Sequence, residues 1–122
     1  MILVDTSVWI DYLHKSDQGL VDLLLADEIC IHPLVIEEIA LGSLARRDEV
    51  LATLAGLDSV GVLSHADALS LVSEHQLWGR GMTAVDAHLL GSVLRSDGDV
   101  QLWTRDKRLK DASEELGVAY SA

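Results

Sequence analysis

The chain has 122 residues, of which 49% are hydrophobic and 24% charged, so it is long enough for one domain with its own core and too apolar for a disordered acidic tail. Twenty Asp and Glu stand against nine Lys and Arg, and the formal net charge of -11, taken alone, argues against nucleic-acid binding, because contacts to phosphate normally need a basic surface. The single cysteine, Cys30, excludes an internal disulfide and a cysteine-rich zinc site.

Short apolar runs alternate with stretches of helical periodicity along the chain. The runs, each the size of a buried strand, are Met1–Val4, Ile29–Ile31, Val60–Leu63, Val100–Trp103 and Val118–Tyr120. Helices are predicted after Asp5, from Asp17 to Leu25, from near Pro33, from Val50 to Leu57, from Ser64 to about Gln76, from Val85 to Ser96 and from Lys107 to Leu116. This alternation predicts an α/β fold, a three-layer α/β/α sandwich with a mostly parallel central sheet.

The sequence contains no run of about 18 apolar residues, no basic leader and no Pro/Ser-rich linker. We therefore expect a single domain over residues 1–122 that is cytoplasmic and does not associate with membranes. In such a fold, ligands gather at the carboxyl ends of the strands.

Two acidic residues come within three positions of the end of a predicted strand, at those carboxyl ends. Asp5 comes after the first strand, and Asp106 follows the strand that ends at Trp103 and opens the last helix. Each has two interpretations that the sequence leaves open, because Asp is also a favoured helix N-cap.

Two further acids interrupt apolar helical faces. On a helical wheel Asp86 falls within the stripe of Val85, Leu89 and Val93, while His88, Ser92 and Arg95 share the opposite face. The wheel also turns Glu38, rather than Glu37, towards the core. A carboxylate on an apolar face is costly unless it is paired or binds a metal, although a first-turn Asp such as Asp86 can instead bind the free N–H groups of its helix.

The four acids could all meet at one edge of the sheet. Neighbouring carboxylates in a partly buried site repel one another, so either some are protonated or divalent cations neutralise them. Hard oxygen ligands favour Mg²⁺ or Mn²⁺ over Zn²⁺. The five histidines are scattered without ligand spacing, and we expect no catalytic role for them.

Four segments of the sequence carry a family resemblance that covers nearly the whole chain. They are Val4-Asp5-Thr6-Ser7-Val8-Trp9, Glu38 with Gly42 four residues later, Val85-Asp86-Ala87-His88-Leu89-Leu90, and Leu102-Trp103-Thr104-Arg105-Asp106-Lys107-Arg108-Leu109. In this order and spacing they resemble the PIN-domain ribonucleases, and most closely the VapC-type toxins of bacterial toxin–antitoxin pairs.

The resemblance implies a function and a site. It implies a Mg²⁺- or Mn²⁺-dependent endoribonuclease in which Asp5, Glu38, Asp86 and Asp106 form the catalytic metal site. Thr104 and Ser7 would have supporting polar roles near the metal. In such an enzyme a metal-activated water attacks an RNA phosphodiester and leaves a 5′ phosphate and a 3′ hydroxyl.

The implied partners are an RNA substrate, a second copy of the chain in a homodimer, and a small VapB-type antitoxin that covers the active-site groove. Four of the nine basic residues lie between positions 105 and 110, beside Asp106. For RNA contacts we therefore single out Arg80, Arg105, Lys107 and Arg108. The acidity of the whole chain then excludes only broad, non-specific binding of nucleic acid.

Three alternatives stay open from sequence. A haloacid-dehalogenase-like phosphatase would need a second Asp two residues after Asp5, where this chain has Ser7. A receiver-like phospho-acceptor module would need paired acids after the first strand and a lysine after a late strand, but Thr104 follows Trp103. The third is a PIN fold retained as a binding or regulatory module without catalysis.

Overall fold

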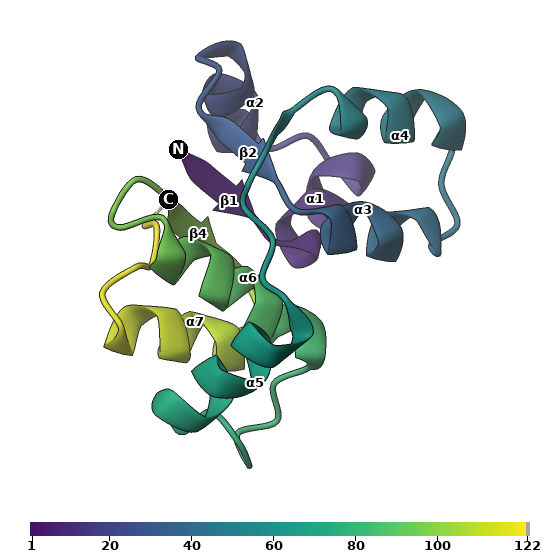
Figure 1. The fold of residues 1–122 in the computed structure, drawn as a ribbon. Coiled ribbons are helices and arrows are strands. Elements are labelled where there is room, and N and C mark those ends of the chain that lie inside the picture. Colours follow the sequence, from purple (N-terminus) through teal and green to yellow (C-terminus); the bar gives the residue numbers. More distant parts are fainter. Residues whose placement is uncertain (122) are drawn as a thin grey trace.

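A computed structural model describes residues 1–121 and shows a parallel four-stranded sheet at the centre of the fold (Figure 1). The strands are short: β1 (Ile2–Val4), β2 (Ile29–Ile31), β3 (Asp58–Ser59) and β4 (Gln101–Trp103), in the spatial order β3-β2-β1-β4. All three strand pairs are parallel, so helices must carry the chain back between strands.

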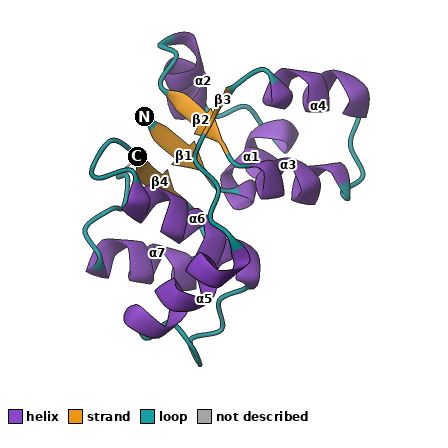
Figure 2. Ribbon diagram, viewed as in Figure 1, coloured by secondary structure: helices purple, strands orange, loops and turns teal. Residues whose placement is uncertain are grey.

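Seven helices within residues 1–121 provide these crossovers. They are α1 (Thr6–His14), α2 (Gln18–Leu25), α3 (Pro33–Ala40), α4 (Arg47–Ala55), α5 (His65–Glu74), α6 (Ala84–Arg95) and α7 (Lys107–Glu115). Figure 2 shows the strands enclosed between two groups of helices. The three-layer α/β/α sandwich predicted from the sequence is confirmed.

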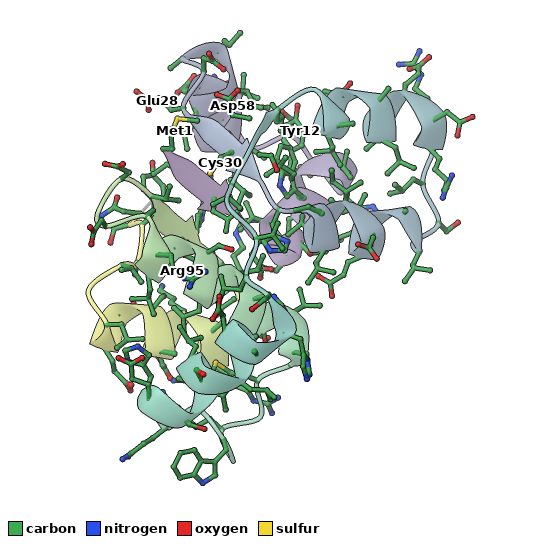
Figure 3. All side chains as sticks on the ribbon, in the orientation of Figure 1. Met1, Tyr12, Glu28, Cys30, Asp58 and Arg95 are labelled. Atoms are coloured by element: carbon green, nitrogen blue, oxygen red, sulfur yellow. The ribbon has the colours of Figure 1, made fainter. Side chains whose placement is uncertain are left out.

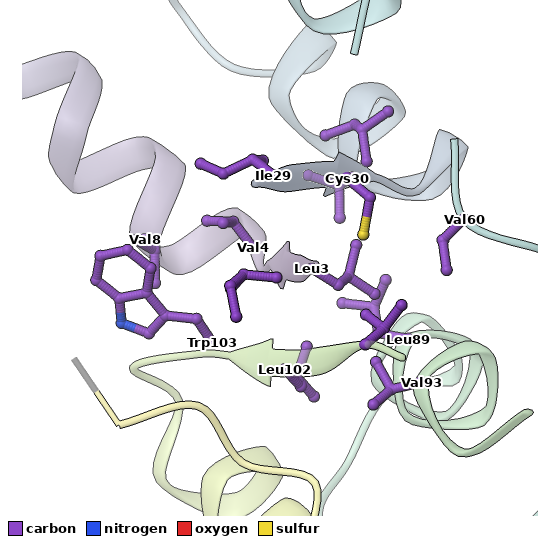
Figure 4. Packing of buried hydrophobic residues seen from close by; sticks show 14 of the residues in the cluster. Leu3, Val4, Val8, Ile29, Cys30, Val60, Leu89, Val93, Leu102 and Trp103 are labelled. Carbon is purple, nitrogen blue, oxygen red and sulfur yellow. The ribbon is translucent and has the colours of Figure 1, made fainter. Parts of the chain in front are cut away.

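The core forms on both faces of the sheet. β1 and β2 are buried at every position, so their residues read as continuous apolar runs rather than alternating ones. Figure 4 shows Val8 of α1 on one side of β1, and Leu89 and Val93 of α6 on the other. Helix α6 is buried around most of its circumference because it lies between the sheet, α5 and α7.

The strand register fixes which residues meet at the functional edge. Val4 is paired with Trp103, so the residues that follow β1 and β4 emerge side by side. The backbone N–H of Asp5 extends this ladder by donating to the carbonyl oxygen of Trp103 at 2.8 Å. Asp5 and Thr104 are thereby neighbours although 99 positions separate them in the chain.

Two predicted strands and one predicted helix face differ from the structure. The strand expected at Val60–Leu63 is wrong: the last hydrogen bond to β2 is donated by the N–H of Val60 to the carbonyl oxygen of Ile31 at 2.9 Å, and Leu63 instead packs on Gly91 of α6. Val118–Tyr120 forms only a single bridge, between Leu102 and Ala119. Ser92, expected on a polar face, is buried and donates to the carbonyl oxygen of Gly61 at 2.6 Å, because the segment after β3 covers that side of α6.

Helix α3 begins at a buried histidine that must stay uncharged. His32 is fully buried, and its Nδ1 accepts the N–H of Leu34 at 3.0 Å as the N-cap. Burial, with a smaller effect from His88, lowers the pKa of His32 from 6.5 to about 4. A protonated ring could not accept the capping bond.

Stability should therefore decrease in mild acid because of His32. The unfolded chain takes up this proton near pH 6.5, and the folded chain only near pH 4, so the contribution of His32 is complete above pH 6.5 and is lost as the pH falls towards 4. The difference corresponds to about 3 kcal/mol of unfolding free energy. We expect urea unfolding of His32→Asn, which keeps a capping acceptor, to lack this part of the pH dependence. Equal pH slopes for the variant and the unmodified chain would contradict the assignment.

Candidate active site

The carboxylate of Asp5 lies at the centre of the carboxyl edge of the sheet. It is buried and caps α1, and its Oδ1 accepts the N–H of Thr6 at 2.8 Å. Its Oδ2 accepts the hydroxyls of Ser7 at 2.9 Å and Thr104 at 2.7 Å. Three donors and the positive end of a helix dipole stabilise this negative charge where it is withdrawn from water.

Thr104 and Ser7 also fix the loop that follows β4. The Thr104 hydroxyl donates to Asp5 and accepts the backbone N–H of Asp106 at 3.0 Å. The Ser7 hydroxyl likewise donates to Asp5 and accepts the backbone N–H of Arg105 at 3.1 Å. Each hydroxyl thus donates its one hydrogen to Asp5 and accepts a backbone N–H, and together they hold Asp106 at a set position relative to Asp5.

Asp86 and Asp106 each cap a helix and face the same edge. Oδ2 of Asp86 accepts the N–H of Thr83 at 3.0 Å in a reciprocal capping box at the start of α6. Oδ1 of Asp106 accepts the N–H groups of Arg108 and Leu109 at the start of α7. The other oxygen of each carboxylate receives no hydrogen bond from the described residues, so capping leaves one oxygen of each acid for a ligand.

Asp86 lies near enough to Asp5 and Asp106 for their charges to act on its carboxyl group. Burial raises the pKa of Asp86, and the negative charges of Asp5 and Asp106 raise it further. The hydrogen bonds from Thr83 act in the opposite direction. The charges of Asp5 and Asp106 therefore act against the ionisation of Asp86, which is a cost that a bound cation would remove.

Glu38 approaches this group from α3. The helical wheel predicted that Glu38 points into the core, and this is wrong: its side chain is exposed, because the buried side of α3 is formed by Val35 and Ile39. Its Oε1 nevertheless accepts the hydroxyl of Thr6 at 2.6 Å, and the N–H of Thr6 binds Asp5. Thr6 therefore links Glu38 of α3 to Asp5. The sequence analysis did not select Thr6, although its position directly after Asp5 was a signal that could have found it.

The oxygen atoms of the four candidate acids are of the kind that a hard divalent cation prefers as ligands. All four acids offer oxygen, and the atoms left without hydrogen bonds belong to separate elements at one edge. Among residues 1–121, however, no three Asp, Glu, His or Cys side chains converge closely enough to enclose an ion together. A hydrated Mg²⁺, which keeps several of its waters and needs few direct protein ligands, suits such an open arrangement.

The basic residues near this edge differ in whether a carboxylate neutralises them. Arg105 binds Asp11 at 2.7 Å and Asp17 at 2.6 Å, and these contacts raise its pKa. The remaining pairs are Arg80 with Glu115 and Lys107 with Asp111. Arg108 has no carboxylate partner among residues 1–121; its Nη1 donates to the carbonyl oxygen of Gly81 at 3.3 Å.

A separate hollow lies away from the four acids. It has a volume of about 420 Å³ and is bordered by Met1, Cys30, Asp58 and Arg95 among others. Figure 3 shows Met1, Cys30 and Asp58 close to one another beside β2. Since burial raises the pKa of the Cys30 thiol, the hollow offers no reactive nucleophile and no concentration of acids comparable to the edge around Asp5.

The chain is similar to known proteins along nearly its whole length. The family model described as PIN domain matches residues 2–115. The protein named Ribonuclease VapC32, from two strains of Mycobacterium tuberculosis, is 59% identical over 119 residues, which cover 98% of this chain and 95% of the relative. The crystal structure of PAE2754 from Pyrobaculum aerophilum matches 98% of this chain and 87% of its own with a TM-score of 0.65, and at 21% identity it shows the shared fold.

We expect Asp86→Asn to raise the melting temperature at neutral pH. The amide removes a charge that burial and two neighbouring acids oppose, while its oxygen can still accept the N–H of Thr83. Because the pKa of Asp86 is raised in the folded chain, the contribution of Asp86 to the free energy of unfolding is complete only below the ordinary pKa range of Asp and is lost as the pH rises. The advantage of the variant should therefore disappear in acid.

Asp67→Asn is the matched control for scanning calorimetry of this variant. Asp67 occupies the same third helical position, after the cap Ser64, but its side chain is 42% exposed and pairs with Arg95 at 2.9 Å. This variant should not gain stability. A lower melting temperature for Asp86→Asn than for Asp67→Asn would show that Asp86 is a structural cap alone.

Proposed function

The chain belongs to the PIN domain family, and from this premise we propose that it is an endoribonuclease, the toxin component of a toxin–antitoxin pair, that hydrolyses RNA phosphodiester bonds with Mg²⁺ or Mn²⁺ at Asp5, Glu38, Asp86 and Asp106. The observation that carries the proposal is the group of mutually repelling carboxylates around Asp5, at the edge where parallel α/β folds bind ligands. The ribonuclease named among its relatives shares 59% of the matched residues.

A divalent ion at this edge supplies an activated water and neutralises the charge that develops on the phosphate. The chain's own residues prepare the edge for it. Asp5 is held in a fixed position by three hydrogen-bond donors and offers an oxygen ligand there. Burial disfavours the ionisation of Asp86, and a cation bound beside its carboxylate would offset that cost.

Glu38 and Asp106 have a different role from that of Asp5, which is buried. Both are exposed, and each keeps one carboxylate oxygen without a hydrogen bond from the described residues. Such oxygens, Oε2 of Glu38 and Oδ2 of Asp106, could bind the waters of a bound ion and accept the proton that the attacking water gives up. Ser7 and Thr104 act by positioning Asp5 and the loop that carries Asp106, since each hydroxyl donates its only hydrogen to Asp5 and accepts a backbone N–H of that loop.

Contact with the RNA backbone is assigned first to Arg108. Of the four basic residues selected from the sequence, Arg80, Arg105 and Lys107 each pair with a carboxylate, whereas Arg108, two residues after the cap Asp106, carries an uncompensated charge. A guanidinium in this position can bind a phosphate oxygen beside the scissile bond. The other three would have to exchange an existing ion pair for the phosphate.

The proposed partners follow from the toxin assignment. They are a small VapB-type antitoxin that covers the acidic edge, and a second copy of the chain in a homodimer, both in the cytoplasm. A net charge of -11 favours a basic antitoxin segment and would speed their encounter. Within residues 1–121, no helix has the length and apolarity needed to cross a membrane.

The nuclease proposal is tested with purified protein free of antitoxin. We expect total RNA to be cleaved with Mg²⁺ or Mn²⁺, and cleavage to fall at least about a hundredfold in Asp5→Asn, in Asp86→Asn and in excess EDTA. Asp67→Asn should cleave normally. Cleavage that survives EDTA and both substitutions would refute metal-dependent hydrolysis at this edge; a chain that binds RNA without cleaving it would be a catalytically inactive binding module.

Arg108→Gln tests the backbone contact separately. The slope of log K against log salt for binding of an oligoribonucleotide should decrease in magnitude by about 1, because one fewer counterion is released. Lys107→Gln, one position earlier but paired with Asp111 at 3.0 Å, should change the slope much less. Equal effects of the two substitutions would mean that Arg108 holds no phosphate.

A further inference from the structure

Trp78 is exposed in a protein that buries its other tryptophans. Its relative accessibility is 62%, against 3% for Trp9 and 5% for Trp103. It lies in the loop between α5 and α6, which projects at the bottom of the molecule in Figure 1. A large aromatic surface left in water costs free energy that binding can recover.

The loop that carries Trp78 is fixed at several points. Leu77, the preceding residue, is buried. The guanidinium of Arg80 binds both carboxylate oxygens of Glu115 on α7, at 2.9 and 3.0 Å. The backbone turns at Gly79 and Gly81, whose φ angles of +73° and +78° disfavour other residues. Trp78 is therefore presented on an anchored loop, and a ligand that stacks on it pays little to order it.

The same loop touches two of the helix starts that carry the site's acids, those of α6 and α7. Its carbonyl at Gly81 accepts Arg108 of α7 at 3.3 Å, and a Cβ at Gly81 would come within 3.0 Å of the same side chain. Its last residue, Thr83, forms the capping box with Asp86. From Trp78 to Thr83 the chain can span at most about 18 Å, so the indole lies within a few nucleotides of the acidic edge.

A hollow connects the indole with the first turn of α6. It has a volume of about 160 Å³ and is lined by Trp78, Gly79, Met82, Thr83 and Ala87, among other residues. Its walls are mostly apolar apart from Thr83, which suits the face of a nucleobase better than a charged group. The uncompensated charge of Arg108 on the other side of Gly81 suits the phosphate that accompanies such a base.

We propose that Trp78 stacks on an unpaired base of the RNA substrate, with the adjoining phosphate on Arg108, and so determines where single-stranded RNA lies relative to the acids. This inference rests on the proposed ribonuclease function. An aromatic face accepts any base, so the contact favours unpaired over duplex RNA rather than one sequence. A protein segment is a less suitable occupant. The apolar surface beside Trp78 is confined to this hollow of about 160 Å³, and the residues that follow in the chain, Gly79, Arg80 and Gly81, are small or charged.

Tryptophan fluorescence reads this contact directly, because Trp78 is the one exposed tryptophan of the three. The probes are a short single-stranded oligoribonucleotide and an oligomer of equal length and charge that lacks bases, with Ca²⁺ replacing Mg²⁺ and the RNA checked to be intact. We expect the intact oligomer to quench the emission and the abasic one to leave it unchanged. Unchanged emission with both, or equal quenching by both, would overturn the proposal.

Affinities of three variants complete the test. Trp78→Ala should raise the Kd for the oligoribonucleotide about 5- to 150-fold, the usual effect of removing one stacking aromatic, and change the Kd for the abasic oligomer less than about twofold. Trp78→Phe should restore most of the affinity. Leu25→Ala, which truncates a side chain that is 82% exposed on α2, is the control and should bind normally.

The outcomes separate this inference from the function on which it rests. Cleavage of total RNA by the unmodified chain, together with unchanged affinity in Trp78→Ala, would overturn the stacking contact and leave the nuclease intact. Base-dependent quenching without any metal-dependent cleavage would support stacking and refute the nuclease. Loss of self-association in Trp78→Ala, with RNA affinity retained, would assign the indole to an interface between copies and overturn the proposal.

Discussion

The fold depends most on how it accommodates one buried negative charge. Asp5 directly follows β1, caps α1, and receives hydrogen bonds from Thr6, Ser7 and Thr104. An ionised carboxylate in that position is tolerated only if its donors are already in place, so the β1–β4 register, the start of α1 and the loop after β4 must all form together. The position of Asp106 follows, because its backbone is bound to the same hydroxyl of Thr104.

Capping and ligand binding are not competing explanations for these acids. Asp5, Asp86 and Asp106 each bind N–H groups at a helix start, which offsets their charge, and Asp86 and Asp106 each retain an oxygen that the described residues leave without a hydrogen bond. Three helix N-termini thus support three carboxylates that repel one another. The protein gives up stability at Asp86 to keep this edge negative, which is the pattern expected where a cation is the missing partner.

Local signals in the sequence predicted much of this arrangement, and long-range contacts account for what was missed. Strands β1 and β2 and the cap at Ser64 could be predicted from short patterns. The segment 60–63 has a strand-like composition but covers α6, which local patterns do not encode. Likewise Arg105, selected for RNA contact, is bound by Asp11 and Asp17, about 90 positions earlier in the chain. The sequence could select the four candidate acids, but within residues 1–121 no three of them enclose an ion. Which basic side chains are free of a carboxylate partner could be learned only from the structure.

The net charge of -11 therefore describes the whole chain better than its functional edge, where Arg108 stands uncompensated beside the acids. The most direct test of the central claim is a titration with Mn²⁺ followed by amide NMR, since a bound paramagnetic ion broadens the resonances nearest to it. The account predicts that the amides of Thr6, Asp86 and Asp106 broaden first and that Asp86→Asn weakens the effect. Broadening centred on Asp11 and Asp17, with the amides around Asp5 still sharp, would contradict it.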